Sequence, residues 1–495
     1  MAESGGAEAN GRFLQYHEPG IVDILIIVSF FTFLWVSGYM SKKIIRAGII
    51  GPIFVGIIYG TPLANILQHT WQETFISLGY IGLILIIFEG GLTTRLDLLR
   101  ANFLLSAVGA TTGVILPISF SYLLLYLGFG YGAVETFIIG AALSATSLGT
   151  TFAVISGASQ SVDLSQTRVG AVLVSAAVLD DVSGLVMSSV IHDLGSISSG
   201  GGSLGWLIGR PILASILMAV LTPVLSKWAL APLFRKFVEP HFHRFDHLFN
   251  IIFMILVLSA FLAIAAYAGT SVLFGAFLAG SFLTYLPSQH PDGPFVVLSR
   301  EHGERASDKS PTFVHTFEHY CLDFQSYVLE PLFFASIGFA IPFLDLWAGE
   351  AIWRGVVYTL LMLVAKFLVG IWIPMWAYCV PPKGRNRDDT LPIEEEKESS
   401  SRVGRARAGM YPGLLLGMAM VARGEIGLLI VEIGYNNTPY VSQAGFLTAI
   451  WAILLNTILG PIAVGMLVKY KASVIAHGDW GLVDSPKATQ EKTQS

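Results

Sequence analysis

SAAVLDDVSGLVM, residues 175–187, is an apolar stretch that carries two adjacent carboxylates, Asp180 and Asp181, at its middle. It lies in an apolar run from about 169 to 191, long enough to cross the ~30 Å hydrocarbon core of a bilayer as an α-helix. Each acid costs about 2.5–3.5 kcal/mol at the centre of such a helix. Both acids therefore need a partner or water, which is typical of a functional site inside a membrane.

The composition of the whole chain agrees with a membrane location. Of its 495 residues 54% are hydrophobic and 13% are charged, and the mean hydropathy is +0.66, whereas soluble domains are roughly 25% charged. The apolar runs are about twenty residues long, and the short alternating segments of a transmembrane β-barrel are missing from the sequence. We therefore expect an all-α membrane protein with about 13 transmembrane helices. The expected spans are 21–39, 47–66, 74–91, 103–127, 135–155, 169–191, 204–229, 247–267, 270–285, 329–347, 352–379, 411–434 and 443–468.

The distribution of Lys and Arg predicts the orientation of the chain. Thirteen spans put 24 of the 29 basic residues on one side and three, Arg12, Arg210 and Arg354, on the other. By the positive-inside rule residues 1–20 are extracellular and the C-terminus is cytoplasmic, with the plasma membrane as the expected location. Two loops, 286–328 and 381–410, and the tail 469–495 are then cytoplasmic.

Three further charged residues, Lys366, Arg423 and Glu425, lie inside expected spans, and we expect them to converge with the two acids on one interior site. Neighbouring residues of a helix point about 100° apart, so the side chains of Asp180 and Asp181 cannot both face the same partner. Lys366 is the natural partner for one of them, which leaves the other to face an aqueous cavity. A proton and a dehydrated monovalent cation compete for such a carboxylate, so the pair is also the expected cation site. The alternative is a buried ion pair that only stabilises the fold, and it would leave one acid uncompensated.

Two spans carry signals for an interruption of the helix. ALSATSLGTTF, 142–152, is rich in Ser, Thr and Gly, and MVARGEIGLL, 420–429, places Gly424 between two charges. Transporters use such broken helices to coordinate ions, although small residues also line ordinary helix interfaces. For Arg423 and Glu425 we favour a structural role, either as a pair or as ties between the broken helix and its neighbours.

The two interrupted spans occupy matching positions if the chain is a pair of repeats. Six spans precede and six follow a linker helix at 204–229, which predicts inverted repeats over about 21–191 and 247–468 within a transporter domain at 21–468. No Gly-rich nucleotide fingerprint follows a strand pattern, so we expect no ATP or NAD chemistry. For a transporter we also expect no cofactor, no enzymatic activity and no nucleic-acid partner.

Eight stretches together resemble the Asp-Asp-bearing branch of the monovalent cation:proton antiporter superfamily, the sodium/proton exchanger type. They are GPIFVGIIYGTPLA (51–64), FEGGLTTRLDLL (88–99), ALSATSLGTTFAVI (142–155), VLDDVSGLV (178–186), GAFLAG (275–280), PLFFASIGFAI (331–341), AKFLVG (365–370) and ARGEIGLLI (422–430).

The resemblance implies a homodimer in which a mobile core domain slides past a dimerisation domain as an elevator. It implies that Asp181 carries the proton and the cation, that Asp180 is the partner of Lys366, and that Thr146 and Ser147 lie at the crossing of the two interrupted helices. An Asp-Asp pair with a Lys is associated in this family with electrogenic exchange of two protons per cation.

The expected function is therefore antiport of Na+ or Li+, or else K+, against H+ across the lipid bilayer. A K+/H+ exchanger and a cation channel or sensor on the same scaffold are the alternatives, and an organic-anion transporter would not need the acidic pair. In the 286–328 loop His302, His315 and His319 are candidates for pH sensing, for metal binding or simply for solvated side chains. Glu89 and Glu330 have no assigned role.

Overall fold

The computed structural model describes residues 18–45, 47–94, 102–146, 167–195, 204–237, 246–286, 312–380, 402–477 and 480. All elements of regular structure in these ranges are helices. The elements of the first part are α1 (Ile21–Ile44), α2 (Ile50–Tyr59), α3 (His69–Thr93), α5 (Phe103–Ser121), the π-turn η1 (Tyr122–Tyr126), α6 (Ala133–Ser144), α8 (Arg168–Gly195), α9 (Leu204–Leu225), the π-turn η4 (Ser226–Leu230) and α10 (Ala231–Phe237).

The second part of the chain is helical too. Its elements are α11 (Asp246–Ala268), α12 (Val272–Tyr285), α14 (Phe313–Tyr320), α15 (Leu322–Phe324), the π-turn η6 (Gln325–Leu329), α16 (Glu330–Ala340), α17 (Phe343–Leu346), α18 (Gly349–Val369), α19 (Trp372–Cys379), α21 (Arg402–Ala408), α22 (Met410–Ala419), α23 (Glu425–Asn437) and α24 (Gln443–His477).

Eight helical stretches in the described chain are long and apolar enough to cross a membrane, so the protein is a multi-pass membrane protein. The count of thirteen crossings stays a prediction. The eight stretches are Ile21–Ile44, His69–Thr93, Phe103–Tyr126, Arg168–Gly195, Gly209–Phe234, His247–Ala268, Gly349–Cys379 and Gln443–Lys471.

Some expected boundaries differ from the structure. The end of the expected 286–328 loop is helical, because α14, α15 and η6 continue into α16. Thr312 caps α14 by accepting a hydrogen bond from the His315 backbone N–H at 3.1 Å, which is a usual N-terminal cap. Likewise α21 lies within the expected 381–410 loop, and α24 continues beyond the expected end of its span at 468.

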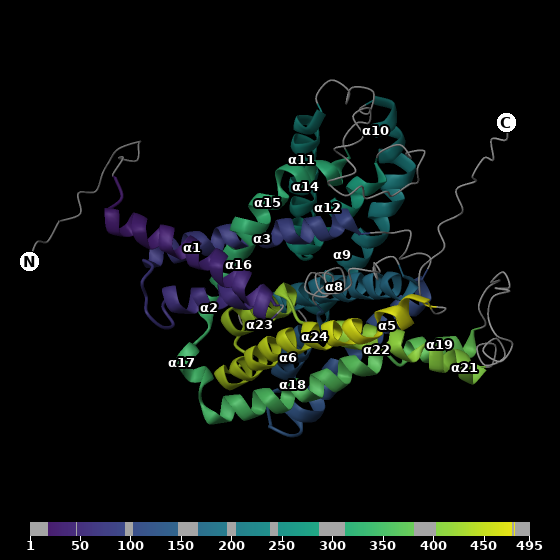
Figure 1. The fold of residues 1–495 in the computed structure, drawn as a ribbon. Coiled ribbons are helices and arrows are strands. Elements are labelled where there is room, and N and C mark those ends of the chain that lie inside the picture. The colour runs from purple at the N-terminus through teal and green to yellow at the C-terminus, as the bar shows by residue number, and fades with distance from the viewer. Residues whose placement is uncertain are drawn as a thin grey trace, which may run out of the picture.

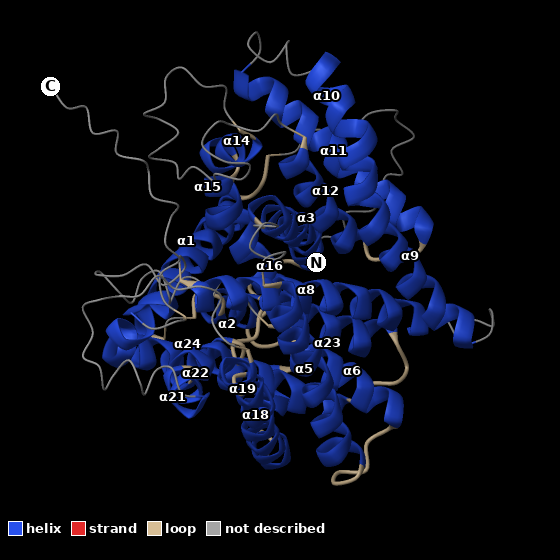
Figure 2. Cartoon of the chain, turned by 90° about the vertical axis from the view of Figure 1, so that its right-hand side faces the viewer, coloured by secondary structure: helices blue, strands red, loops and turns tan. Residues whose placement is uncertain are grey.

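The helices pack in two groups that each combine elements from both halves of the chain. In the first group, α3 packs on α12 and α16, α2 packs on α1 and α16, and α11 packs on α12. The second group contains α5, α6, α8, α18, α22, α23 and α24. Figures 1 and 2 show α11, α12 and α14 on one side of α3 and the helices α5, α6, α18, α22 and α24 on its other side.

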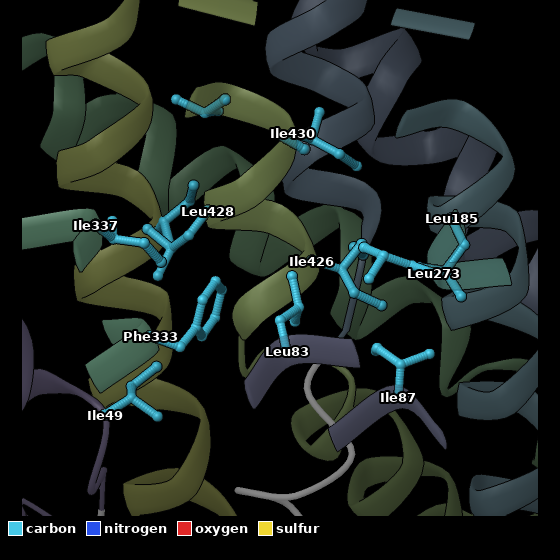
Figure 3. Close-up of a cluster of buried hydrophobic side chains, with 14 of the residues drawn as sticks. Ile49, Leu83, Ile87, Leu185, Leu273, Phe333, Ile337, Ile426, Leu428 and Ile430 are labelled. Atoms are coloured by element: carbon cyan, nitrogen blue, oxygen red, sulfur yellow. The ribbon is translucent and has the colours of Figure 1, made fainter. Parts of the chain in front are cut away.

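An apolar seam joins the two groups, and Figure 3 shows its side chains. Leu83 and Ile87 of α3 lie there with side chains from α16, α8 and α23, all within one buried cluster. The seam also contains Phe333 and Ile337 of α16, Leu185 of α8, and Ile426, Leu428 and Ile430 of α23. The contact between the groups thus includes a continuous apolar surface beside the start of α23.

Candidate functional site

Two helices end near the middle of the second group, where the sequence predicts interruptions. α22 ends at Ala419 and α23 begins at Glu425, and between them Gly424 is extended, with φ −140° and ψ −155°. α6 ends at Ser144, and Ala145 is extended as well. The non-helical ends meet, because Thr146 Oγ1 lies 3.4 Å from the carbonyl oxygen of Met420. Helix ends carry unpaired backbone groups and partial charges, which can bind ions and charged side chains.

Close packing of α23 on α6 depends on a glycine. A Cβ atom at Gly427 would lie 2.7 Å from the carbonyl oxygen of Ala142. Since real side chains do not approach backbone that closely, the two helices can keep this distance only with glycine at position 427. The glycine therefore holds the start of α23 against the last turn of α6.

Arg423 ties the end of α6 to the interrupted helix. Its side chain is fully buried, and Nη1 donates hydrogen bonds to the carbonyl oxygens of Ala145 at 3.0 Å and Ser144 at 3.4 Å. Thr457 Oγ1 of α24 donates to the Arg423 carbonyl oxygen at 3.0 Å. Of the two structural roles expected for Arg423, the described contacts fit a tie to neighbouring helices. They include no ion pair between Arg423 and Glu425.

Asp180, Lys366 and Thr146 form a buried triangle. Lys366 Nζ donates to Asp180 Oδ2 and to Thr146 Oγ1, both at 2.9 Å, and the Thr146 hydroxyl donates to Asp180 Oδ2. The Asp180 and Lys366 side chains are fully buried and Thr146 is 4% exposed. The triangle joins α8, α18 and the end of α6, and hydrogen bonding of both charges offsets part of the cost of burying them.

A glycine on α5 leaves room for the Lys366 side chain. A Cβ atom at Gly113 would lie 3.3 Å from Lys366 Nζ and 3.1 Å from Met420 Cε. Sequence reasoning missed this position. The repeated small residues of α5, SAVGATTGV at 106–114, were the available signal, since such residues allow close helix contacts in membranes. Thr457 was missed too, and nothing in its local sequence marks it.

Asp181 forms no hydrogen bond or salt bridge with the triangle. It follows Asp180 on the same helix, about 100° further round the axis, and its Oδ1 has no hydrogen-bond partner among the residues that the structure describes. The charges that act on it are those of Glu425, Asp180 and Lys366. The five charged groups therefore comprise three acids and two bases. Only Asp180 of the three acids forms a salt bridge in the described chain, and neither Asp181 nor Glu425 does. Such an arrangement can bind a proton or a cation.

Not every candidate residue can be placed. Ser147 and the rest of the expected interruption, 147–152, lie outside the described residues. Glu425, the first residue of α23, is partly buried at the positive end of that helix, where an acidic side chain is favoured.

Comparisons with known proteins relate the whole membrane domain to ion exchangers. A family model described as "Sodium/hydrogen exchanger, transmembrane" matches residues 26–470. The Na(+)/H(+) antiporter of Enterococcus hirae is 24% identical over 440 residues, which cover 88% of this chain and 95% of that one. The Na(+)/H(+)-K(+) antiporter GerN of Bacillus cereus is 23% identical over 430 residues, 86% of this chain and 91% of that one.

A solved structure has a similar fold. The sodium proton antiporter MjNhaP1 from Methanocaldococcus jannaschii, determined at pH 8, superposes with a TM-score of 0.56 and 16% sequence identity. The alignment covers 94% of this chain and all of that one. At this identity the similarity shows a shared fold.

Proposed function

The chain belongs to the sodium/hydrogen exchanger family, and on that premise we propose that it exchanges Na+ or Li+ for H+ at Asp181. Membership of the family confirms the resemblance seen in the sequence and supports cation:proton exchange as the activity. K+ is a further candidate cation, because one relative is named as a Na(+)/H(+)-K(+) antiporter.

The observation that carries this proposal is the difference between the two adjacent acids. Asp180 Oδ2 is held by Lys366 and Thr146, whereas no salt bridge of the described residues involves Asp181. The Oδ1 atoms of both acids have no hydrogen-bond partner in the described chain. A carboxylate without a basic partner is costly inside a membrane until a proton or a cation neutralises it. Because either the proton or the cation, but not both, can occupy the Asp181 carboxylate at a time, competition at this carboxylate couples the movement of the cation to the movement of the proton.

Further oxygen ligands for the cation are available at the crossing. We propose that Thr146, Ser147 and the carbonyl groups of the two non-helical ends complete the site, as in other transporters with broken helices. Asp180 supports the cation through its charge, and Arg423 keeps the α6 end in place. Glu425 adds negative charge beside Asp181.

We propose a second role for Lys366 in this scheme. Lysine, unlike arginine, can give up its proton inside a protein. If Lys366 releases a proton when the cation draws Asp180 away, two protons move for each cation, and exchange is electrogenic. This stoichiometry rests on the family association of the Asp-Asp pair with a lysine.

The two helix groups support a proposal for alternating access. We propose that the second group is the mobile core and that the first group, with α1 to α3 and α11 to α16, forms the dimerisation domain of a homodimer. The apolar seam of Figure 3 supports sliding, because apolar surfaces can shift past each other without breaking ion pairs. Inverted repeats at 21–191 and 247–468, joined by the 204–229 linker, are part of the same proposal, as is an extracellular N-terminus in the plasma membrane.

The test is proton flux in liposomes that contain the purified protein and a pH-sensitive dye. Addition of Na+ or Li+ is expected to drive proton movement in the wild type and in Asp193→Asn, a control on the same helix α8, but not in Asp181→Asn. Equal flux in Asp181→Asn and wild type would overturn the assignment of the site. Cation conduction without proton movement would instead favour the alternative that the protein is a cation channel.

A further inference from the structure

Trp480, beyond the last helix, lies at the start of α8. It follows shortly after His477, where α24 ends, and its side chain is 3% exposed. The Trp480 carbonyl oxygen accepts a hydrogen bond from the Val169 backbone N–H at 3.1 Å. The predicted orientation agrees with this contact, because it places both the tail and the start of α8 on the cytoplasmic side.

Trp480 completes the cap of α8. The first N–H groups of a helix have no partner within the helix. The Thr167 hydroxyl accepts a hydrogen bond from the Gly170 N–H at 3.1 Å, which is a usual N-terminal cap. The Val169 N–H is bonded instead by Trp480. A residue from the far end of the chain therefore supplies part of the cap of the helix that carries both acids.

Arg168 gives a reason for the indole side chain. As the first residue of α8, it puts a positive charge at the positive end of the helix dipole, which is unfavourable. The Arg168 guanidinium carbon lies 4.6 Å from the centre of a Trp480 ring. The face of an indole attracts a cation, so this contact compensates for the position of the charge. Apolar packing alone would not call for a cation against the ring.

Trp480 connects two helices that hold different parts of the candidate site. α8 carries the two acids, while α24 holds the interrupted helix through the hydrogen bond from Thr457 Oγ1 to the Arg423 carbonyl oxygen. α8 packs mainly on α5 and α23, and α24 packs mainly on α18 and α22. The indole belongs to a buried apolar cluster that includes Val172 of α8 and Val468 of α24. Trp480 thus helps to fix the two helices relative to each other.

We propose that Trp480 is a positioning residue for the cation site at Asp181 and acts through α8. This helix runs without proline from Arg168 to Gly195, so a shift of its first turn is transmitted along its axis. At 1.5 Å per residue, Asp180 is about 18 Å along this axis from Arg168. Without the indole, the start of α8 loses an anchor, and the acids move relative to the crossing that α24 supports. The inference rests on the proposed function, because it concerns the affinity for the transported cation.

Two measurements on full-length Trp480→Ala test the proposal. Hydrogen–deuterium exchange followed by mass spectrometry should show faster exchange at the first turn of α8 than in the wild type. In liposomes, the Na+ concentration that gives half-maximal proton flux should rise about threefold or more, because the contact with Arg168 is lost. Partial unfolding would instead lower the maximal flux and leave that concentration unchanged.

Two variants serve as controls. Trp480→Phe keeps an aromatic face for Arg168 and should restore most of the wild-type Na+ dependence. Val474→Ala also removes an apolar side chain near the end of the chain, but Val474 is 50% exposed, so this variant should change neither measurement. Trp480→Leu keeps apolar volume without the aromatic face and decides the question should Trp480→Ala not fold.

The proposal is overturned if hydrogen exchange at the start of α8 is the same in Trp480→Ala and the wild type. It is also overturned if the substitution changes only the maximal flux. Absence of Na+-driven proton flux in wild-type liposomes would count against the exchanger, whereas the hydrogen exchange would still decide whether Trp480 holds α8.

Discussion

Lys366 Nζ lies 2.9 Å from Asp180 Oδ2 with both side chains fully buried. The neighbouring Asp181 has no such contact in the described chain. Two adjacent, chemically identical residues therefore have different surroundings, and the different roles proposed for them rest on this difference.

Lys366→Met should destabilise the protein by about 3–5 kcal/mol, because it leaves the Asp180 charge buried without its partner. The double variant Asp180→Asn with Lys366→Met removes both charges and should recover much of the loss. Thermal unfolding in detergent, followed by tryptophan fluorescence, measures both, with exposed Lys43→Met as the control. A double variant less stable than Lys366→Met would contradict the pairing.

Thr146 should be needed for its hydroxyl. Thr146→Val keeps the shape but removes the donor to Asp180 and the acceptor for Lys366, at an expected cost of about 1–3 kcal/mol. Thr146→Ser retains the hydroxyl and should behave nearly like the wild type, both in thermal stability and in Na+-driven proton flux. Equal behaviour of the valine and serine variants would show that the hydroxyl has no role.

Gly427→Ala should force α23 away from α6, since the new methyl group would meet the Ala142 carbonyl oxygen. Overpacking of this kind costs about 1–3 kcal/mol. Gly90→Ala is the matched control within a helix, because its Cβ would have nothing within 4 Å. It should leave stability unchanged or raise it, since alanine favours helix more than glycine does. Similar shifts of Tm in the same direction for both variants would contradict the steric role of Gly427.

Arg423→Met should impair cation exchange by releasing the carbonyl groups of Ser144 and Ala145. Hydrogen bonds from a charged group contribute about 1.5–3 kcal/mol, so kcat/KM for the cation should fall about tenfold or more. Arg423→Lys keeps the charge and should recover part of the activity. Because the residue acts through helix position, KM is expected to rise. A change in kcat alone would argue against this role.

The two cysteines provide a test of topology and of pH dependence. Burial raises the pKa of the Cys321 thiol, so less of the reactive thiolate is present at neutral pH. Labelling of Cys379→Ser by a membrane-impermeant maleimide should therefore be slow at neutral pH and accelerate as the pH rises. It should occur only from the cytoplasmic side. Labelling from the outside would reverse the predicted orientation, and a rate independent of pH would contradict the effect of burial.

Much of the candidate site was predictable because charges are rare and costly in lipid. The cost of Asp180, Asp181, Lys366, Arg423 and Glu425 in an apolar environment required them to be explained together. The interruption near Gly424 was predictable for the same reason, since a glycine between two charges does not suit a continuous membrane helix. The structure places the end of α22 and the start of α23 on either side of it.

Other features carried no readable signal. Hydropathy recognises apolar runs of membrane length, so it missed the helices between Phe313 and Leu329, which are short and partly polar. The π-turn at Gln325 depends on a hydrogen bond pattern that composition does not encode. Gly113 and Thr457 act through contacts with residues more than thirty positions away in the chain.

The sequence by itself determined that this chain crosses a membrane, which residues are too costly to be there without a function, and where a helix is interrupted. Each of these follows from local composition and from the free energy of placing charge in hydrocarbon. The residues alone left open which acid contacts Lys366, and the family resemblance named Asp180. The tertiary structure shows this contact, and it alone decided that Arg423 binds the end of α6. The physical reason is that rotation about a helix axis and the packing of distant helices choose the partner, and neither can be read from one segment alone.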